Sequence, residues 1–295
     1  MDIVQYLKNK KELVDSYLEA YVSSKKGQNG CPKELYEAMR YALMAGGKRI
    51  RPILALAGYE AVNGKTNNVM PVASSLELIH TYSLIHDDLP AMDDDDMRRN
   101  MPTTHIAFGE ATAILAGDAL LTEAFNIISN SKAEPGILIN VIKEVTHACG
   151  PDGMVGGQTV DILMEGKKAE KDDIIYIHTH KTGVFIKAAV RVGAIMADAT
   201  EDELAALTTY GDKVGLAFQI ADDILDITGT TEELGKTAGS DNTNAKNTYP
   251  SIFGIDESRK IAEALISDAI KALRGFDEKA DPLREIAKYI ISRRN

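Results

Sequence analysis

The sequence is short of several residue types, and each shortage excludes a class of protein. Two cysteines in 295 residues cannot form a disulfide framework or a tetrathiolate zinc site, so a reducing compartment is expected. The absence of tryptophan and an aromatic content of 6% leave little for stacking on carbohydrate. Nine prolines and 23 glycines are too few for a fibrous or low-complexity chain.

Long uninterrupted apolar runs are also missing. None reaches the about 18 residues of a membrane helix, and the lysines near the N-terminus are not followed by an apolar segment. The sequence therefore predicts a cytoplasmic protein without a membrane span. Its net charge of −11, from 33 basic and 44 acidic residues, predicts no nucleic-acid partner. The 44% hydrophobic content is that of an ordinary globular chain.

Apolar residues recur at spacings of three and four, with little period-two alternation, which predicts an all-α fold. The clearest helices are expected at 33–45, stopping at Gly46-Gly47, and at 70–88, with Pro71 in the first turn. The segment 235–250 has the composition of a functional loop. Because no linker divides the chain, we expect a single all-helical domain over 1–295. Further helices are expected at 107–130, 136–149, 155–165, 171–180, 183–198, 256–275 and 282–292, with two more across 201–228 separated near Gly211.

Nine aspartates lie in two short segments and need an explanation. They are Asp87, Asp88, Asp93 to Asp96, Asp222, Asp223 and Asp226. In the second segment Gln219, Asp222, Asp223 and Asp226 are spaced 0, +3, +4 and +7, which places them on one helical face. That face is either a solvated acidic surface or a buried one, on which cations must compensate the repulsion between the carboxylates.

Oxygen ligands without a nearby cysteine or histidine cluster suit Mg²⁺, which shares its coordination with substrate phosphates. A calcium-binding loop is a competing interpretation of the first segment. The alternating acids and central glycine of such a loop are absent. Two acidic clusters of this kind could clamp a diphosphate through metal ions.

Cationic residues accompany both acidic segments. Arg98 and Arg99 follow the first, and Gly46-Gly47-Lys48-Arg49-Ile50-Arg51-Pro52 offers backbone that can approach a phosphate together with bidentate guanidinium groups. A solvated basic turn is the alternative for this stretch. Lys181-Thr182-Gly183 and Lys236 complete the set, and His80 lies seven residues before Asp87, on the same helical face.

In this combination the sequence resembles the short-chain trans-prenyltransferases of the bacterial farnesyl diphosphate synthase type. The motifs run in the family's order from about residue 35 to the C-terminus. They are Gly-Gly-Lys-Arg-Ile-Arg-Pro, Asp-Asp-Leu-Pro-Ala-Met-Asp with Arg-Arg behind it, Pro102-Thr103-Thr104, Gly153-Met154-Val155-Gly156-Gly157-Gln158, Lys-Thr-Gly, Gln-Ile-Ala-Asp-Asp-Ile-Leu-Asp and Lys246-Asn247-Thr248-Tyr249-Pro250. One departure is Asn100, where the family generally has glycine.

The resemblance implies a large helical bundle of the isoprenoid synthase type, with a central cavity between two aspartate-bearing helices. It implies condensation of isopentenyl diphosphate with dimethylallyl or geranyl diphosphate, three Mg²⁺ ions per substrate-bound site, and a homodimer. The implied metal ligands are Asp87, Asp93 and Asp222, with Asp88 and Asp226 in support. The implied ligands of the allylic diphosphate are Arg98, Lys181, Gln219 and Lys236, and Thr182 is implied to stabilise the cation. The implied ligands of isopentenyl diphosphate are Lys48, Arg51, His80 and Arg99.

Product length depends on the residues before Asp87. In similar enzymes an aromatic residue five positions earlier, here Tyr82, limits the product to fifteen carbons. On a helical wheel Tyr82 lies about 140° from Asp87, whereas Ser83 points nearly the same way. Tyr82 is therefore either the floor of the product cavity or a core residue.

Three other functions compete with farnesyl diphosphate synthesis. A geranylgeranyl diphosphate synthase would use the same chemistry in a deeper cavity. A terpene cyclase or squalene-type synthase would not need the isopentenyl site formed by Lys48, Arg51 and His80. A noncatalytic regulatory subunit should have lost acidic residues from one cluster, and both clusters are complete. Basic Arg293-Arg294 is expected to cover the site on closure.

Overall fold

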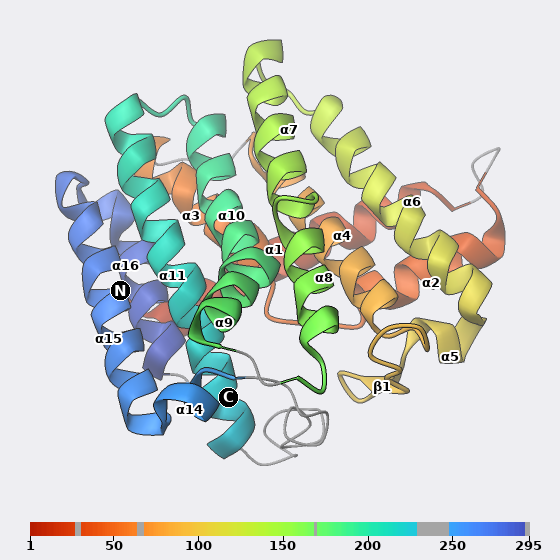
Figure 1. The fold of residues 1–295 in the computed structure, drawn as a ribbon. Helices are drawn as coiled ribbons and strands as arrows, with labels where there is room; N and C mark the ends of the chain where they lie inside the picture. Colours follow the sequence, from red (N-terminus) through yellow and green to blue (C-terminus); the bar gives the residue numbers. More distant parts are fainter. Residues whose placement is uncertain (27–30, 64–67, 168–169, 229–247, 293–295) are drawn as a thin grey trace.

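The computed structural model describes residues 1–26, 31–63, 68–167, 170–228 and 248–292, and helices dominate these ranges (Figure 1). The predicted all-α fold is confirmed. A two-stranded antiparallel hairpin, β1 (Met97–Arg98) with β2 (Met101–Pro102), interrupts the helices. In chain order the helices are α1 (Ile3–Ser24), α2 (Lys33–Met44), α3 (Ile50–Asn63), α4 (Met70–Asp87), α5 (Thr104–Phe108), α6 (Glu110–Ser129), α7 (Pro135–Cys149), α8 (Met154–Met164), α9 (Lys171–Ile177), the π-helix η1 (His178–Gly183), α10 (Val184–Met196), α11 (Glu201–Thr228), α14 (Tyr249–Phe253), α15 (Ile255–Ala272), the short 3₁₀ turns η2 (Leu273–Gly275) and η3 (Glu278–Ala280), and α16 (Asp281–Ser292).

Helix ends follow the local chemistry of the sequence. Helix α2 stops before Gly46, whose φ of 97° is unfavourable for residues with a side chain. Helix α4 carries Pro71 in its first turn, as predicted. The single helix expected over 107–130 is divided into α5 and α6 at Gly109, which has φ 84°.

Two predicted interruptions are wrong. The chain stays helical from Lys171 to Met196, because the π-helix η1 joins α9 to α10 where two separate helices were expected. Helix α11 continues through Gly211, which was expected to divide it. A Cβ at Gly211 would lie 2.8 Å from the Cα of Lys187, so this glycine permits close packing of α11 on α10 and does not end a helix.

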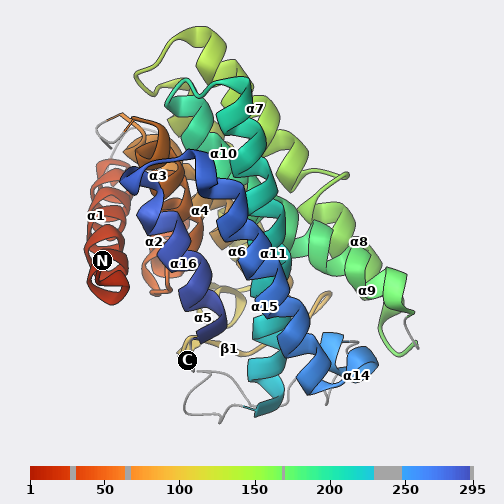
Figure 2. The same cartoon turned by 90° about the vertical axis from the view of Figure 1, so that its left-hand side faces the viewer.

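The core is built around α3, α4 and α10. Helix α10 is buried along most of its length, including Phe185 and Val190 at 0% exposure. Its backbone approaches α3 so closely that a Cβ at Gly193 would lie 2.0 Å from the carbonyl oxygen of Ala55. Helix α11 packs along α10, α15 covers α11, and α16 packs on both α15 and α3 (Figure 2).

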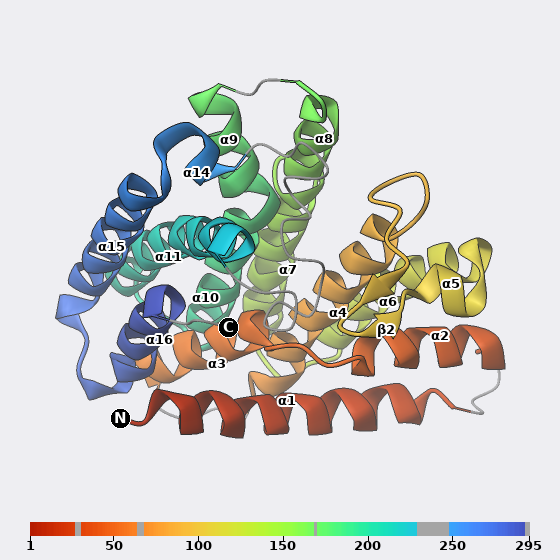
Figure 3. The same ribbon diagram turned by 90° about the horizontal axis from the view of Figure 1, so that it is seen from below.

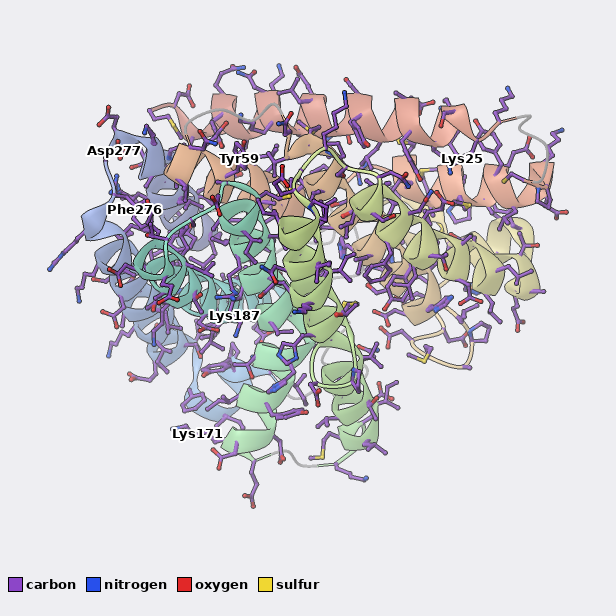
Figure 4. The ribbon with its side chains drawn as sticks, turned by 90° about the horizontal axis from the view of Figure 1, so that it is seen from above. Lys25, Tyr59, Lys171, Lys187, Phe276 and Asp277 are labelled. Atoms are coloured by element: carbon purple, nitrogen blue, oxygen red, sulfur yellow. The ribbon has the colours of Figure 1, made fainter. Side chains whose placement is uncertain are left out.

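Helix α1 lies alongside α2 and α3 at one edge of the bundle (Figure 3). Lys25, just after α1, forms an ion pair of 2.7 Å with Glu123 of α6 and ties the two helices together (Figure 4). The C-terminal ends of α4 and α11, which carry the two aspartate clusters, lie at the same end of the bundle (Figures 1 and 3).

Within the described residues, α6 is the one helix long and apolar enough to cross a bilayer by length and composition. In this fold α6 packs along α4 and α2. Its buried side chains, including Leu120 and Ala124, belong to the main hydrophobic core.

Candidate active site

The first aspartate cluster forms where α4 ends. Asp87 is the last residue of the helix, and the following turn folds back on it, with the Asp93 amide donating to the Asp87 carbonyl oxygen at 2.9 Å. The pKa of Asp87 is raised to about 6, mainly by burial, with the positive charge of Lys181 opposing the rise and the negative charge of Asp93 adding to it. The carboxylates of Asp87 and Asp93 therefore lie close to each other, with a cation nearby.

Asp88 has a different environment from Asp87. It is 3% exposed, and its Oδ1 lies 2.7 Å from Nε and 2.6 Å from Nη2 of Arg98. Arg98 stands on β1, so this pair fixes the hairpin against the end of α4. The next two residues, Arg99 and Asn100, have φ of 53° and 61°. Asparagine tolerates this left-handed conformation, which explains why it can replace glycine here.

The predicted isopentenyl diphosphate ligands differ in their exposure to solvent. Arg51 and His80 line the same cavity as Asp87, whereas Lys48 is exposed. Burial lowers the pKa of Arg51, opposed by the carboxylates of Glu77 and Asp222. Burial, followed by the charges of Arg51 and other arginines, also holds the pKa of His80 well below its ordinary value, so its ring is neutral at pH 7.

Arg49 is not part of a solvated basic turn. It is 2% exposed and donates to Asp15 at 2.7 Å, to Glu77 at 2.7 Å and to the Leu43 carbonyl oxygen at 2.8 Å. It therefore joins α1, α2 and α4 beneath the basic turn. Arg99 donates to the carbonyl oxygen of Gly46, which anchors the hairpin on the same turn.

The π-helix η1 presents Lys181 and Thr182 to the cavity. Lys181 Nζ donates to Asp161 Oδ2 at 2.7 Å. A Cβ at Gly157 would lie 2.2 Å from the backbone nitrogen of Lys181, so only glycine allows α8 to pack this closely on η1. Asp161 lies on α8, one turn after Gln158 and just beyond the motif, and was not among the predicted site residues.

The second aspartate cluster lies in the last turns of α11. Asp223 and Asp226 are each 4% exposed, whereas Gln219 and Asp222 are half-buried. The face is therefore not a solvated acidic surface. Gln219 Nε2 donates to Asp223 Oδ1 at 2.9 Å. The charge of Asp222 acts on Arg51, which places it within electrostatic reach of the cavity.

One cavity of about 410 Å³ brings together seven of the predicted site residues, namely Arg51, His80, Tyr82, Ser83, Asp87, Lys181 and Thr182. Apolar side chains such as Met154 and Ile162 line it as well. Asp88, Arg98 and Arg99 instead line a smaller cavity of about 30 Å³ on the other side of Leu84, which borders both. Lys236, Lys246, Arg293 and Arg294 lie outside the described residues.

Both candidate chain-length residues contact the cavity. Tyr82 is 7% exposed and packs edge-on against the ring of His86, with centroids 5.8 Å apart. Ser83 Oγ donates to the His80 carbonyl oxygen at 2.9 Å. Tyr82 thus lines the cavity together with Ser83, although the helical wheel places it about 140° from Asp87.

The sequence and the fold both match those of known proteins. The family model described as polyprenyl synthetase matches residues 32–290. The chain is 46% identical to a geranylgeranyl diphosphate synthase of Cyanophora paradoxa, covering 100% of this chain and 97% of the relative. It is 48% identical to a dimethylallyltranstransferase of Fischerella ambigua, covering 99% and 84%.

Among solved structures, an FPP/GFPP synthase from Zymomonas mobilis superposes with a TM-score of 0.85 at 38% identity, covering 98% of this chain and 99% of that one. The geranylgeranyl pyrophosphate synthetase of Pyrococcus horikoshii superposes with a TM-score of 0.88 at 31% identity, covering 99% and 100%. These matches extend over nearly the whole length of both partners. The chain belongs to the polyprenyl synthetase family and is a trans-prenyltransferase.

Proposed function

We propose that this trans-prenyltransferase condenses isopentenyl diphosphate with dimethylallyl and then geranyl diphosphate to give (E,E)-farnesyl diphosphate. The observation that carries the proposal is the shared cavity, which is lined by the charged residues Asp87, Lys181 and Arg51 together with His80 and Tyr82. This arrangement supports one site for an allylic diphosphate, a neighbouring site for a second diphosphate, and an apolar space of limited depth.

Ionisation of the allylic substrate places negative charge on the departing diphosphate. Lys181 and Arg98 stabilise that charge more than they stabilise the ground state, because the charge grows as the carbon–oxygen bond breaks. Asp161 and Asp88 hold these two cations at 2.7 Å and so orient them before substrate binds. Gln219 and Lys236 are proposed as further ligands of this diphosphate.

The allylic cation needs an environment without strong nucleophiles. The lining offers the Thr182 oxygen atoms for stabilisation, and Met154 and Ile162 provide apolar walls. Arg51, His80, Arg99 and Lys48 hold isopentenyl diphosphate so that its double bond can attack. The released diphosphate accepts the proton that is lost after condensation.

Mg²⁺ is the proposed metal, and it would supply electrostatic stabilisation of the leaving diphosphate. Asp87, Asp93 and Asp222 would hold it, with Asp88 and Asp226 in support, and three ions are proposed per substrate-bound site. The donor set consists of hard carboxylate oxygens, as Mg²⁺ prefers. No group of three or more metal-ligating side chains converges within the described ranges.

A geranylgeranyl diphosphate synthase is the second candidate, and it is favoured by similarity to several relatives of that name. The chemistry would be the same, with one further condensation. We favour the farnesyl product because Tyr82 lines the cavity as a bulky, buried ring. Chromatography of the dephosphorylated product decides between fifteen and twenty carbons.

The activity itself is tested by incubating the purified protein with Mg²⁺, isopentenyl diphosphate and geranyl diphosphate, and measuring diphosphate release. We expect release only when both substrates are present. Release without isopentenyl diphosphate would indicate a cyclase-type reaction. No turnover by the wild-type chain would support a noncatalytic subunit.

We also propose one domain, a homodimer and a cytoplasmic location. Exposed apolar residues gather on α5 and α6, including Ile106, Ile114 and Leu115 at 52%, 44% and 58% exposure, and a second copy would cover them. Sedimentation equilibrium tests the dimer. Some relatives are named as chloroplastic proteins, so fractionation of the source cell tests the location.

A further inference from the structure

Asp223, the second aspartate of the α11 cluster, lies where three functional segments meet. Its Oδ2 accepts from the Tyr249 backbone amide at 2.9 Å, at the first residue of α14, and lies 3.3 Å from His178 Nε2, at the first residue of η1. Its Oδ1 accepts from Gln219 on its own helix at 2.9 Å. One carboxylate thus connects α11, η1 and α14.

The His178 ring is held on two sides. It stacks on the ring of Tyr249 with centroids 5.4 Å apart and planes 16° apart, and Tyr249 stacks in turn on Phe253 at 4.9 Å. Burial lowers the pKa of His178 to about 4, so the ring is neutral. Its Nδ1 has no hydrogen-bond partner among the described residues. With the proton on Nε2, the ring N–H points toward Asp223 Oδ2, which is 3.3 Å away.

The contact between His178 and Asp223 is linked to the cavity through the π-helix η1. Lys181 and Thr182 follow His178 by three and four residues in the same π-helix, and both line the cavity with Asp87. A shift of His178 would rotate or translate the single helical turn that carries both residues. Because His178 and Asp223 are 6% and 4% exposed, water cannot readily replace their contact.

We propose that Asp223 is a positioning residue that acts through His178 to hold Lys181 and Thr182 at the allylic diphosphate. This role rests on the proposed prenyl transfer. It separates the two neighbouring aspartates of α11, because the charge of Asp222 acts on Arg51 of the cavity while Asp223 holds the π-helix. The same division applies to α4, where Asp87 lines the cavity and Asp88 holds Arg98.

The test compares Asp223→Ala, the conservative Asp223→Asn, and His178→Phe, which keeps a ring on Tyr249 but removes the donor. For Asp223→Ala and His178→Phe we expect KM for the allylic diphosphate to rise about tenfold, which corresponds to one lost hydrogen bond to a charged group. KM for isopentenyl diphosphate and the Mg²⁺ concentration at half-maximal rate should stay unchanged. Asp223→Asn should restore most of the allylic KM, because its amide oxygen can still accept.

A matched control is Asp212→Ala on the same helix, where the lost partner is Lys187 at 3.0 Å, and no kinetic constant should change. A shifted Mg²⁺ requirement in Asp223→Ala, with Asp223→Asn equally impaired, would make Asp223 a metal ligand. A lower kcat with both KM values unchanged would make its role merely structural. An unaltered allylic KM in His178→Phe would also overturn the proposal.

A second measurement does not depend on activity. In a double-mutant cycle with Asp223→Ala and His178→Ala, urea unfolding midpoints should fall by less in the double variant than the two single shifts predict, because the residues share one contact. Additive shifts would contradict the coupling. An inactive wild-type enzyme would refute the proposed function while leaving this cycle able to confirm or overturn the link between Asp223 and His178.

Discussion

The raised pKa of Asp87 predicts that removing its charge stabilises the metal-free protein while destroying activity. In Asp87→Asn the amide keeps the size of the side chain and cannot ionise. Burial favours the neutral form of this group, as the pKa of about 6 against an ordinary value of 3.8 shows. The buried charge of Asp87 therefore lowers the free energy of unfolding of the wild-type protein at neutral pH, and the variant lacks this destabilisation.

The magnitude follows from linkage between proton binding and folding. The folded state binds the Asp87 proton more tightly than the unfolded state, so wild-type stability falls as pH rises from about 4 to 6 and remains lower above that range. A shift of this size corresponds to about 3 kcal/mol at most. We expect roughly 1 to 2 kcal/mol, because the half-buried carboxylate keeps some contact with water, which screens the charge.

The assay is urea unfolding in EDTA at pH 7.5 and at pH 4.5, for wild type, Asp87→Asn and the half-exposed control Asp212→Asn. The midpoint of Asp87→Asn should exceed that of wild type at pH 7.5, and the difference should shrink at pH 4.5. The control should change stability by less than about 0.5 kcal/mol. Equal or lower stability of Asp87→Asn at pH 7.5, or a difference that does not depend on pH, would refute the reasoning.

Three further predictions use other parts of the site. Tyr82→Ala should lengthen the product because it removes a buried ring from the cavity lining, and an unchanged product distribution on chromatography would remove Tyr82 as the limit. Gly157→Ala should raise KM for the allylic diphosphate more than tenfold, since its Cβ would meet the Lys181 backbone nitrogen at 2.2 Å; steady-state kinetics with an unchanged KM would count against that contact. Arg49→Met should destabilise the fold by about 3 to 5 kcal/mol, because Glu77 would lose its buried partner, and a change below 1 kcal/mol in urea unfolding would show that the pair is dispensable.

Much of the fold could be predicted from hydrophobic spacing and from helix-ending residues. Helices α2, α4, α7 and α8 lie within one residue of their expected bounds. Gly211 was misjudged because a glycine that ends a helix and one that lets two helices touch look alike in sequence. Only the neighbouring helix distinguishes them.

The sequence predicted which residues form the site better than it predicted which of them contact each other. Helical periodicity placed His80 and Asp87 on one face, and both line the cavity. Periodicity could not separate Asp87 from Asp88, since adjacent carboxylates differ only in what surrounds them after folding. Asp161 and Asp223 were missed as contact partners of Lys181 and His178 for the same reason, because each contact joins segments at least 20 residues apart.

The π-helix also has a geometric consequence for the helices on either side. An α-helix turns by about 100° per residue, so the wider turn at 178–183 changes the angular phase between α9 and α10. The packing face of α10, with Phe185 and Val190, can then match the core while Lys181 and Thr182 still face Asp87. Deleting one residue from this turn would restore ordinary helical phase. Either Phe185 and Val190 would then turn out of the core, or Lys181 and Thr182 would turn away from the cavity.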